Sequence, residues 1–230
     1  MLESRRTNSL LAKLPSRDRR RLGSAMETVD MPFGQSLYHS GDRIDYVYFP
    51  NDCLVSLVAT ADDRQLAEVG LVGSEGEVGG ATALSTGISP FQAIVQGAGT
   101  AMRIKASLLR GKFREMNSLQ RGLLNFSYLL TAQVAQTAAC NRFHPVSARL
   151  ARWLLMTRDR RLTNEFRLTQ QFLAHMLGVQ RGGISRAASD LKRRQIIRYS
   201  RGRLTILNEK ALAAASCRCY QQVKKLYERA

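Results

Sequence analysis

A short stretch in the second half of the chain carries side chains that can hydrogen-bond to nucleic acid. Gln180, Arg181, Ser185 and Arg186 would lie on the outer side of one helix, with Ser189 beside them. An α-helix fits the major groove of B-DNA, and arginine can hold the O6 and N7 atoms of guanine with two parallel bonds. Glutamine and serine can bond to base edges or to phosphates. These residue types at this spacing predict a surface that contacts DNA.

Two short helices separated by a glycine turn, over Leu168–Arg194, would position these side chains. Thr169 can cap the first helix, because its hydroxyl can accept a bond from backbone N–H groups that otherwise lack partners. Gly178 can end that helix in a left-handed conformation that costs glycine little. The second helix is predicted to begin near Gln180, and to bury Ile184, Ala187, Ala188 and Leu191. The pattern predicts a helix-turn-helix.

Two adjacent glycines near the start of the second helix are unusual for a helix selected only for stability. If both are helical, Gly182 and Gly183 together cost about 2 kcal/mol relative to alanine. One explanation is a fraying first turn, and the other is that the missing side chains let the helix sit deep in the groove. We favour the second explanation, because both glycines lie beside Arg181.

A β-hairpin is predicted directly after the second helix. Ile196–Tyr199 and Arg203–Leu207 have the composition of short strands, and Ser200, Arg201 and Gly202 form the turn between them. A hairpin in this position is typical of a wing. The arginines on it are expected near phosphates, which position a protein on DNA without specifying sequence; they are Arg198, Arg201 and Arg203.

The segment Leu168–Leu207 resembles the winged helix of the Crp/Fnr family of bacterial transcription regulators, and IDYVYFPND at Ile44–Asp52 resembles that family's sensor β-roll. In the family, a residue triad on the recognition helix contacts bases. Its arginines fall on Arg181 and Arg186, whereas its usual glutamate falls on Gly182, so the resemblance does not predict the family's usual half-site. It does imply double-stranded DNA as the ligand, with RNA polymerase as a candidate partner. The predicted DNA contacts are Thr169, Gln170, Gln180, Arg181, Gly182, Gly183, Ser185, Arg186, Arg198, Arg201 and Arg203.

The resemblance and the local patterns together predict an α+β protein. Short β-like runs with turns between them, over Glu27–Ile104, indicate a β-roll or jelly roll. We expect a sensor domain with flanking helices over residues 1–116, a dimerisation helix and hinge over 117–142, and a winged helix-turn-helix over 143–230. One helix is expected to run from Asn208 to the C-terminus.

The net charge of +17 is concentrated in the predicted winged-helix part of the 230-residue chain. From Arg142 onward, 20 Lys and Arg stand against 5 Asp and Glu, whereas residues 1–141 hold 15 against 13. Basic charge that coincides with a DNA-contacting motif favours nucleic acid over a membrane surface as the partner. The polar N-terminus does not resemble a signal peptide, so a cytoplasmic protein is expected.

The four cysteines are not expected to form a ligand set. Cys217 and Cys219 are two residues apart on an expected helix, where such residues do not face each other, and no histidine has zinc-finger spacing. Cys53 and Cys140 are distant from them in sequence. The prediction is structural thiols with no metal and no cofactor, while a redox role for Cys217 and Cys219 stays open.

Gly73–Ala93 occupies the position of the family's phosphate-binding cassette. In members that bind cyclic nucleotides, a Gly-Glu pair meets the ribose and an Arg-Ser or Arg-Thr pair meets the cyclic phosphate. Gly76 and Glu77 resemble the first pair, but the second falls on Phe91 and Gln92, and losing a charge-assisted contact costs about 2 kcal/mol or more. We therefore expect an effector other than cAMP or none, with Glu77 accepting bonds from backbone N–H groups.

A heptad-like repeat predicts a dimerisation helix. Its members recur at alternating steps of four and three, the seam of a two-stranded coiled coil; they are Leu119, Leu123, Phe126, Leu130, Gln133, Thr137 and Cys140. The alternative is that the helix packs on its own β-roll through Leu124, Tyr128 and Ala135. Both can hold, because apolar residues cover more than one face.

Three functions follow from these patterns. The first is a homodimeric regulator that binds a palindromic DNA site, since a two-fold protein presents two recognition helices about one DNA turn apart. The second is an enzyme built on the β-roll, which little supports: the three histidines are scattered, and no nucleophile elbow or P-loop is present. The third is a nonspecific architectural DNA-binding protein. We favour the first.

Overall fold

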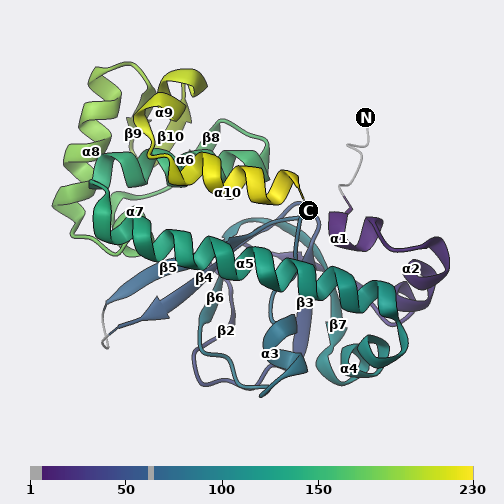
Figure 1. Cartoon of the computed structure of the whole chain (residues 1–230). Coiled ribbons are helices and arrows are strands. Elements are labelled where there is room, and N and C mark those ends of the chain that lie inside the picture. The colour runs from purple at the N-terminus through teal and green to yellow at the C-terminus, as the bar shows by residue number, and fades with distance from the viewer. Residues whose placement is uncertain (1–6, 62–64, 230) are drawn as a thin grey trace. The chain divides into compact units, whose positions relative to one another are not determined.

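The computed structural model describes residues 7–61 and 65–229, and they form the predicted mixture of helices and sheets (Figure 1). The chain divides into two compact units. One contains the described residues up to Ala59 together with Leu71–Thr131, and the other contains the described residues of Thr60–Gly70 and those from Ala132 onward. No helix in the described part of the chain is long and apolar enough to cross a membrane.

The predicted β-roll is confirmed as two antiparallel sheets, with strand orders β1-β7-β3 and β2-β6-β4-β5. Burial alternates along most of β3, whereas five consecutive residues of β4 are buried, and Val47, Phe49, Val55 and Val95 are fully buried in the first unit. The strands are β1 (Glu27–Met31), β2 (Ser36–Tyr38), β3 (Tyr46–Pro50), β4 (Leu54–Thr60), β5 (Leu66–Val72), β6 (Gln92–Gly97) and β7 (Gly99–Lys105).

Short helices flank the roll, and a buried asparagine ties the first of them to it. Asn8 caps α1 by accepting a bond from the Leu11 N–H, and its side-chain amide donates to the Pro50 and Gly76 carbonyls at 2.9 and 2.8 Å. These bonds fix the start of the described chain to the end of β3 and to the loop that contains Gly76. The helices are α1 (Ser9–Ala12), α2 (Ser16–Gly23), α3 (Gly80–Leu84) and α4 (Ala106–Glu115).

The long helix α5 spans Asn117–Phe143, where a dimerisation helix followed by a hinge was predicted over residues 117–142. The residues after Cys140 were expected to interrupt the helical pattern. Instead, the His144 N–H donates to the Cys140 carbonyl at 3.1 Å, so the last turn of α5 is complete.

The two faces of α5 are exchanged relative to the sequence prediction. Leu119, Leu123, Phe126 and Gln133, expected to face a second chain, are at most 2% exposed within the single chain. The Phe126 ring packs where a Cβ on Gly76 would lie only 2.0 Å away. The polar members also bond internally, since Thr137 accepts from Arg152 and Gln133 accepts from Arg160, and Leu130 and Thr137 are half-buried.

The alternative prediction, that Leu124, Tyr128 and Ala135 pack on the β-roll, is also not met. Leu124 and Tyr128 are 62% and 63% exposed, and Ala135 is also exposed. Both expectations are wrong for one reason: apolar residues on two faces of the helix do not reveal which face the roll covers. The free face of the helix is therefore the one that carries Leu124 and Tyr128.

The second unit is the predicted winged helix-turn-helix on a buried central helix. Leu150, Leu154, Leu173, Ile184 and Leu191 form the fully buried part of its core. The short strand β8 was not predicted; it pairs with β10, giving the strand order β8-β10-β9. The elements are α6 (Val146–Arg161), β8 (Glu165–Arg167), α7 (Gln170–Leu177), α8 (Arg181–Arg193), β9 (Ile197–Ser200), β10 (Arg203–Ile206), α9 (Glu209–Ala215) and α10 (Cys219–Glu228).

The expected single C-terminal helix is wrong, because the helix breaks at Ser216. Asn208 caps α9 as predicted, accepting a bond from the Ala211 N–H. At Ser216 the backbone becomes extended (ψ 161°), and the serine hydroxyl donates to the Ala213 carbonyl at 2.8 Å. Serine side chains compete in this way with the helical backbone. Cys217 therefore lies in a link, and Cys219 begins α10.

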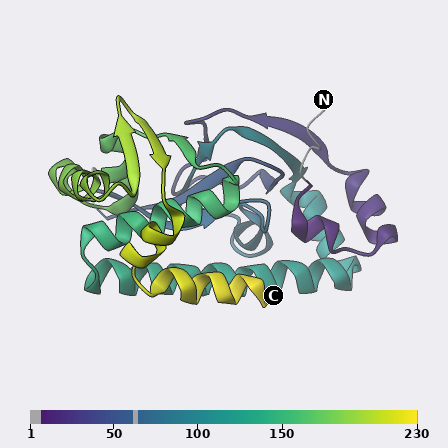
Figure 2. The ribbon, with the colours of Figure 1, turned by 90° about the horizontal axis from the view of Figure 1, so that it is seen from above.

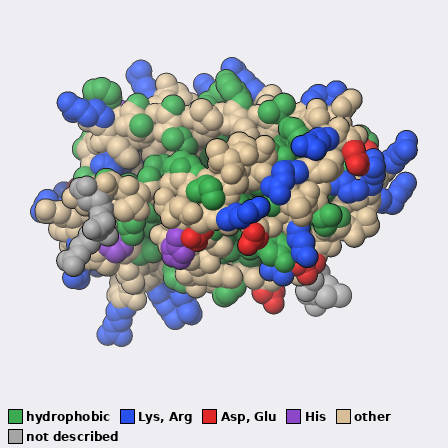
Figure 3. Space-filling model, turned by 90° about the horizontal axis from the view of Figure 1, so that it is seen from below, with side chains coloured by type: hydrophobic (Ala, Val, Ile, Leu, Met, Phe, Trp, Pro, Cys, Tyr) green, Lys and Arg blue, Asp and Glu red, His purple; other side chains and the backbone are tan. Residues whose placement is uncertain are grey.

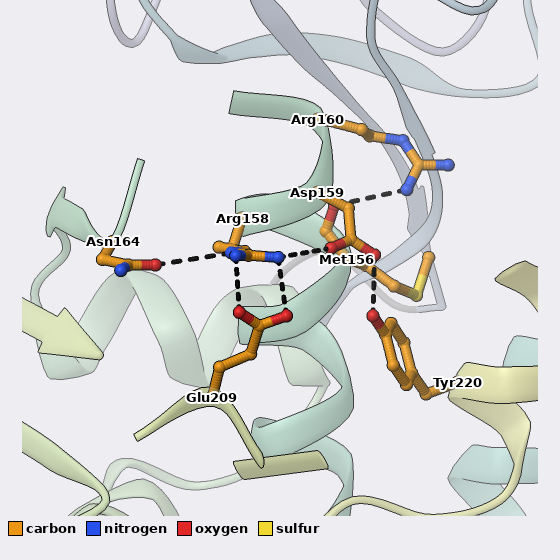
Figure 4. Close-up of polar contacts among 7 residues, drawn as sticks. All are labelled: Met156, Arg158, Asp159, Arg160, Asn164, Glu209 and Tyr220. Carbon is orange, nitrogen blue, oxygen red and sulfur yellow. Dashed lines mark hydrogen bonds and ion pairs between the residues drawn. The ribbon is translucent and has the colours of Figure 1, made fainter. Parts of the chain in front are cut away.

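Charged side chains hold α6 to both C-terminal helices (Figure 4). The Arg158 guanidinium donates two bonds to the Glu209 carboxylate, at 2.7 and 2.5 Å, and the Tyr220 hydroxyl donates to Asp159 at 2.9 Å. A two-bond arginine–carboxylate pair fixes orientation as well as distance. This network positions α9 and α10 on α6.

Candidate nucleic-acid interface

The predicted helix-turn-helix is confirmed in its caps and its turn. The Thr169 hydroxyl accepts a bond from the Phe172 N–H at 3.0 Å, which caps α7. Gly178 ends α7 with φ 59°, a left-handed conformation suited to glycine, and the Val179 N–H donates to the Ala174 carbonyl. α8 then begins at Arg181, directly after Gln180.

The faces of α8 lie as the spacing predicted. Its buried residues are Ile184, Ala187, Ala188 and Leu191. The side chains with hydrogen-bonding groups lie on the other face, where Gln180, Arg181 and Arg186 are exposed and Ser185 is half-buried. Because the apolar stripe packs against α6, the orientation of the outer face is fixed by the core of the unit.

The wing is a tight hairpin with arginines at and beside its tip. Ser200 pairs with Arg203, and the two residues between them have positive φ, 47° at Arg201 and 74° at Gly202. Two such residues match the twist of the strands in a two-residue hairpin. Figure 2 shows the β9–β10 hairpin projecting beside α8, which is seen almost end on.

A shallow hollow of about 400 Å³ joins the helix-turn-helix to the wing. It is bordered by predicted contact residues Thr169, Gln170, Arg181 and Arg201, together with Gly202. The wing is fixed here, because the Leu168 N–H donates to the Gly202 carbonyl at 2.8 Å and the Tyr199 hydroxyl donates to the Leu168 carbonyl at 2.7 Å. Gln171, Tyr199 and Ser200 also line it and were not predicted as site residues. Tyr199 was predicted only as a strand residue, and no local signal reveals its bond to Leu168.

The arginines of this surface differ from several arginines of the same unit in having no carboxylate partner. Arg158, Arg193 and Arg194 form ion pairs with carboxylates. Within residues 7–61 and 65–229, no ion pair or ring contact engages five exposed arginines of this surface, namely Arg181 and Arg186 on α8 and Arg198, Arg201 and Arg203 on the wing. Lys and Arg also stand out over Asp and Glu on the face drawn in Figure 3. Unpaired exposed guanidinium groups can bind phosphates and guanine edges without first breaking an internal bond.

The paired glycines of α8 are not required by packing within the chain. A Cβ on Gly182 would meet only the Arg186 side chain, at 3.6 Å, and one on Gly183 would meet only Val146, at 3.9 Å. These are ordinary contacts, and neither glycine has a positive φ. The structure therefore contains no internal reason for either glycine, which supports a role at the outer face.

In the first unit, both residues of the cassette's Gly-Glu pair already have partners within the chain. The Phe126 ring covers Gly76. Glu77 is 3% exposed and accepts a bond from the Gly80 N–H at the start of α3, as expected for a structural acceptor. Burial raises the pKa of Glu77 to about 7. Gln92 donates to the Ser36 hydroxyl at 3.3 Å, so it also has an internal partner.

Comparison with known proteins agrees with this fold and surface. Residues 148–215 match the model of the Crp-like helix-turn-helix domain. No curated protein sequence matches the chain. Similar solved structures include the c-di-GMP-responsive global regulator CLP of Xanthomonas campestris (16% identity, 84% of this chain and 99% of that one, TM-score 0.70). A CRP-family transcriptional regulator of Thermus thermophilus (19%, 82% and 96%, 0.68) and FixK2 of Bradyrhizobium japonicum (16%, 84% and 98%, 0.70) are also similar.

The chain contains a Crp-like helix-turn-helix domain at residues 148–215. Its overall fold is shared with the solved structures of these transcription regulators.

Replacing Gly182 and Gly183 with alanine tests whether the two glycines serve DNA binding at the expense of stability. The double variant should raise the free energy of unfolding by about 2 kcal/mol, because both glycines lie within α8 and alanine favours a helix over glycine. It should lower DNA affinity tenfold or more, because methyl groups would hold α8 away from the groove. Denaturant unfolding and DNA titration at fixed salt measure the two effects.

Gly111→Ala is the matched control, since Gly111 lies inside α4 with open space around it. It should raise the free energy of unfolding by about 1 kcal/mol, as one helical glycine is replaced, and leave DNA binding unchanged. If the double variant bound DNA as tightly as the control, the two glycines would have no role in groove contact.

Proposed function

We propose that the protein acts as a homodimer that binds a palindromic DNA site and regulates transcription in the cytoplasm. The observation that carries the proposal is the set of five exposed arginines without internal partners on α8 and the wing. A surface of this charge, on elements of this shape, suits major-groove entry by α8 with the wing beside the backbone. No enzymatic role is proposed.

The residues of the interface divide by what they can contact. Arg181 and Arg186 lie on the outer face of α8 and are assigned to base edges, where each can hold a guanine. Gly182 and Gly183 allow close approach of the helix. The phosphate contacts are assigned to the residues at the rim of the surface, namely Thr169, Gln170, Gln180, Ser185, Arg198, Arg201 and Arg203.

The dimer interface is assigned to the exposed face of α5. Leu124, Tyr128 and Thr131 are exposed and lie four and three residues apart, and Ala135 and Ala138, also exposed, continue the same steps in the sequence. This is the spacing of a coiled-coil seam. Two large apolar side chains more than 60% exposed on one helix are a surface that a second copy would cover.

Regulation is assigned to an effector other than cAMP, or to no effector. The cassette position that would need a cation for the cyclic phosphate holds Phe91 and Gln92, and Glu77 already serves the backbone of α3. A buried phosphate without a charge partner is costly. A nonspecific architectural DNA-binding protein is the alternative to sequence-specific regulation.

Arg181→Ala tests sequence-specific contact. It should weaken binding to the preferred site by about 1–3 kcal/mol and relax preference at one base pair in each half-site. Arg203→Ala on the wing is the comparison, and it should weaken binding to all sequences about equally while reducing the salt slope by about one. Binding profiles over single-base variants of the site distinguish the two; unchanged preference in Arg181→Ala would refute its assignment to a base.

Tyr128→Glu tests the dimer interface. A carboxylate buried against a second copy would be costly, so the variant should become monomeric at concentrations where the wild type is dimeric. Analytical ultracentrifugation measures the change. Leu108→Glu, on the exposed side of α4, is the matched control and should remain dimeric. A Tyr128→Glu protein that stays fully dimeric would exclude this face.

A further inference from the structure

Four side chains with metal-binding atoms converge in the second unit. Cys140, His144, Cys217 and Cys219 each offer one sulfur or nitrogen atom, and these four atoms all lie within 4.8 Å of one another. The three cysteines are buried, and His144 is half-buried. The DNA interface uses none of these residues.

Two local structures bring these side chains together. Cys140 and His144 are four residues apart at the end of α5, so they lie on the same side of the last helical turn, which the His144 N–H bond to Cys140 completes. The break between α9 and α10 supplies the other pair. Cys217 lies in the link and Cys219 begins α10, so the two residues are not on one helix. The expectation that their thiols do not face each other, which assumed a single helix, therefore does not apply.

The distances suit one tetrahedral ion. Cys140 Sγ lies 3.4 Å from Cys217 Sγ, and Cys219 Sγ lies 3.7 Å from His144 Nδ1. Zinc bonds are about 2.3 Å to sulfur and about 2.0 Å to nitrogen. In a tetrahedral site they place two sulfur atoms about 3.8 Å apart and a sulfur and a nitrogen atom about 3.6 Å apart. An iron–sulfur cluster would need its ligands spread over several iron atoms. The compact set of atoms therefore favours a single ion.

The charges around these four side chains suit an anionic site. Arg149 and Arg152 are 9% and 6% exposed, and both interact electrostatically with Cys140. In the described part of the chain neither is ion-paired with a carboxylate, and the Nε atom of each is buried without a hydrogen-bond partner. A buried guanidinium needs a counter-charge. One Zn²⁺ with three thiolates and a neutral imidazole carries a net charge of about −1, which would supply it.

A further side chain supports the sulfur of Cys219. The Gln136 side-chain amide, one turn before Cys140 on α5, donates to Cys219 Sγ at 3.0 Å. Hydrogen bonds to ligating atoms orient them and tune their affinity for the metal. Gln136, Cys140 and His144 thus form a row along one side of α5.

We propose that Cys140, His144, Cys217 and Cys219 bind one Zn²⁺ ion in a closed, four-ligand structural site. Binding releases the three thiol protons and requires no oxidant. The ion fastens the end of α5 to the link between α9 and α10. A Cys140–Cys217 disulfide would use two of the four groups and leave Cys219 and His144 without a role.

Metal analysis of the full chain, purified with a reductant and without added metal, tests the proposal. We expect about one zinc per chain, retained against a weak chelator. Replacement by Co²⁺ should give the intense visible bands of a tetrahedral ion together with a thiolate charge-transfer band. Cys217→Ser should lose this spectrum and weaken binding at least tenfold, whereas Cys53→Ser, a buried cysteine of the first unit, should keep both.

Gln136→Ala gives a second arm that retains all four ligands. It should keep the tetrahedral spectrum and weaken affinity by about tenfold. The proposal would be overturned by a wild-type protein that takes up neither Zn²⁺ nor Co²⁺ while its thiols are reduced. A Cys140–Cys217 disulfide found by mass spectrometry in metal-free protein would overturn it equally.

Discussion

The packing of α8 on α6 is the constraint on which the DNA-contacting surface depends. Ile184 and Leu191 are fully buried, and their place in the core allows only one rotation of α8 about its axis. That rotation turns Arg181 and Arg186 outward. Burying two large aliphatic side chains contributes about 3–6 kcal/mol, far more than any single exposed hydrogen bond. The chemistry of the surface is therefore set by apolar contacts that never touch DNA.

The arginines of the second unit fall into two groups. Arginines that hold the unit together are paired, as Arg158 is with Glu209, or buried near thiols, as Arg149 and Arg152 are. Arg181 and Arg186 of α8 and the arginines of the wing have no such partners. An internally paired guanidinium would have to break its bond before binding phosphate, so leaving these side chains unpaired favours association with DNA. The same division explains why net charge alone would not have located the interface.

The sequence predicted the features that depend on nearby residues. The Thr169 cap, the Gly178 turn, the buried stripe of α8 and the hairpin tip at Arg201 and Gly202 follow from spacing and backbone preference. The free face of α5 could not be predicted, because the packing of the first unit decides which face is covered. The Phe126 ring is buried against Gly76, whereas Tyr128 is exposed. The convergence of Cys140 with Cys217 was missed because the two residues are 77 positions apart in sequence and because the helix break at Ser216 was not predicted.

In the proposed function, the outer face of α8 specifies a DNA sequence while the protein is a dimer. Selection of random duplex DNA by the purified protein without added ligand, followed by titration at fixed salt against a scrambled duplex, tests it most directly. We expect a palindrome bound about 10³-fold or more above scrambled DNA. Only salt-sensitive binding, with no enriched sequence with or without candidate nucleotides, would contradict it and indicate an architectural DNA-binding protein.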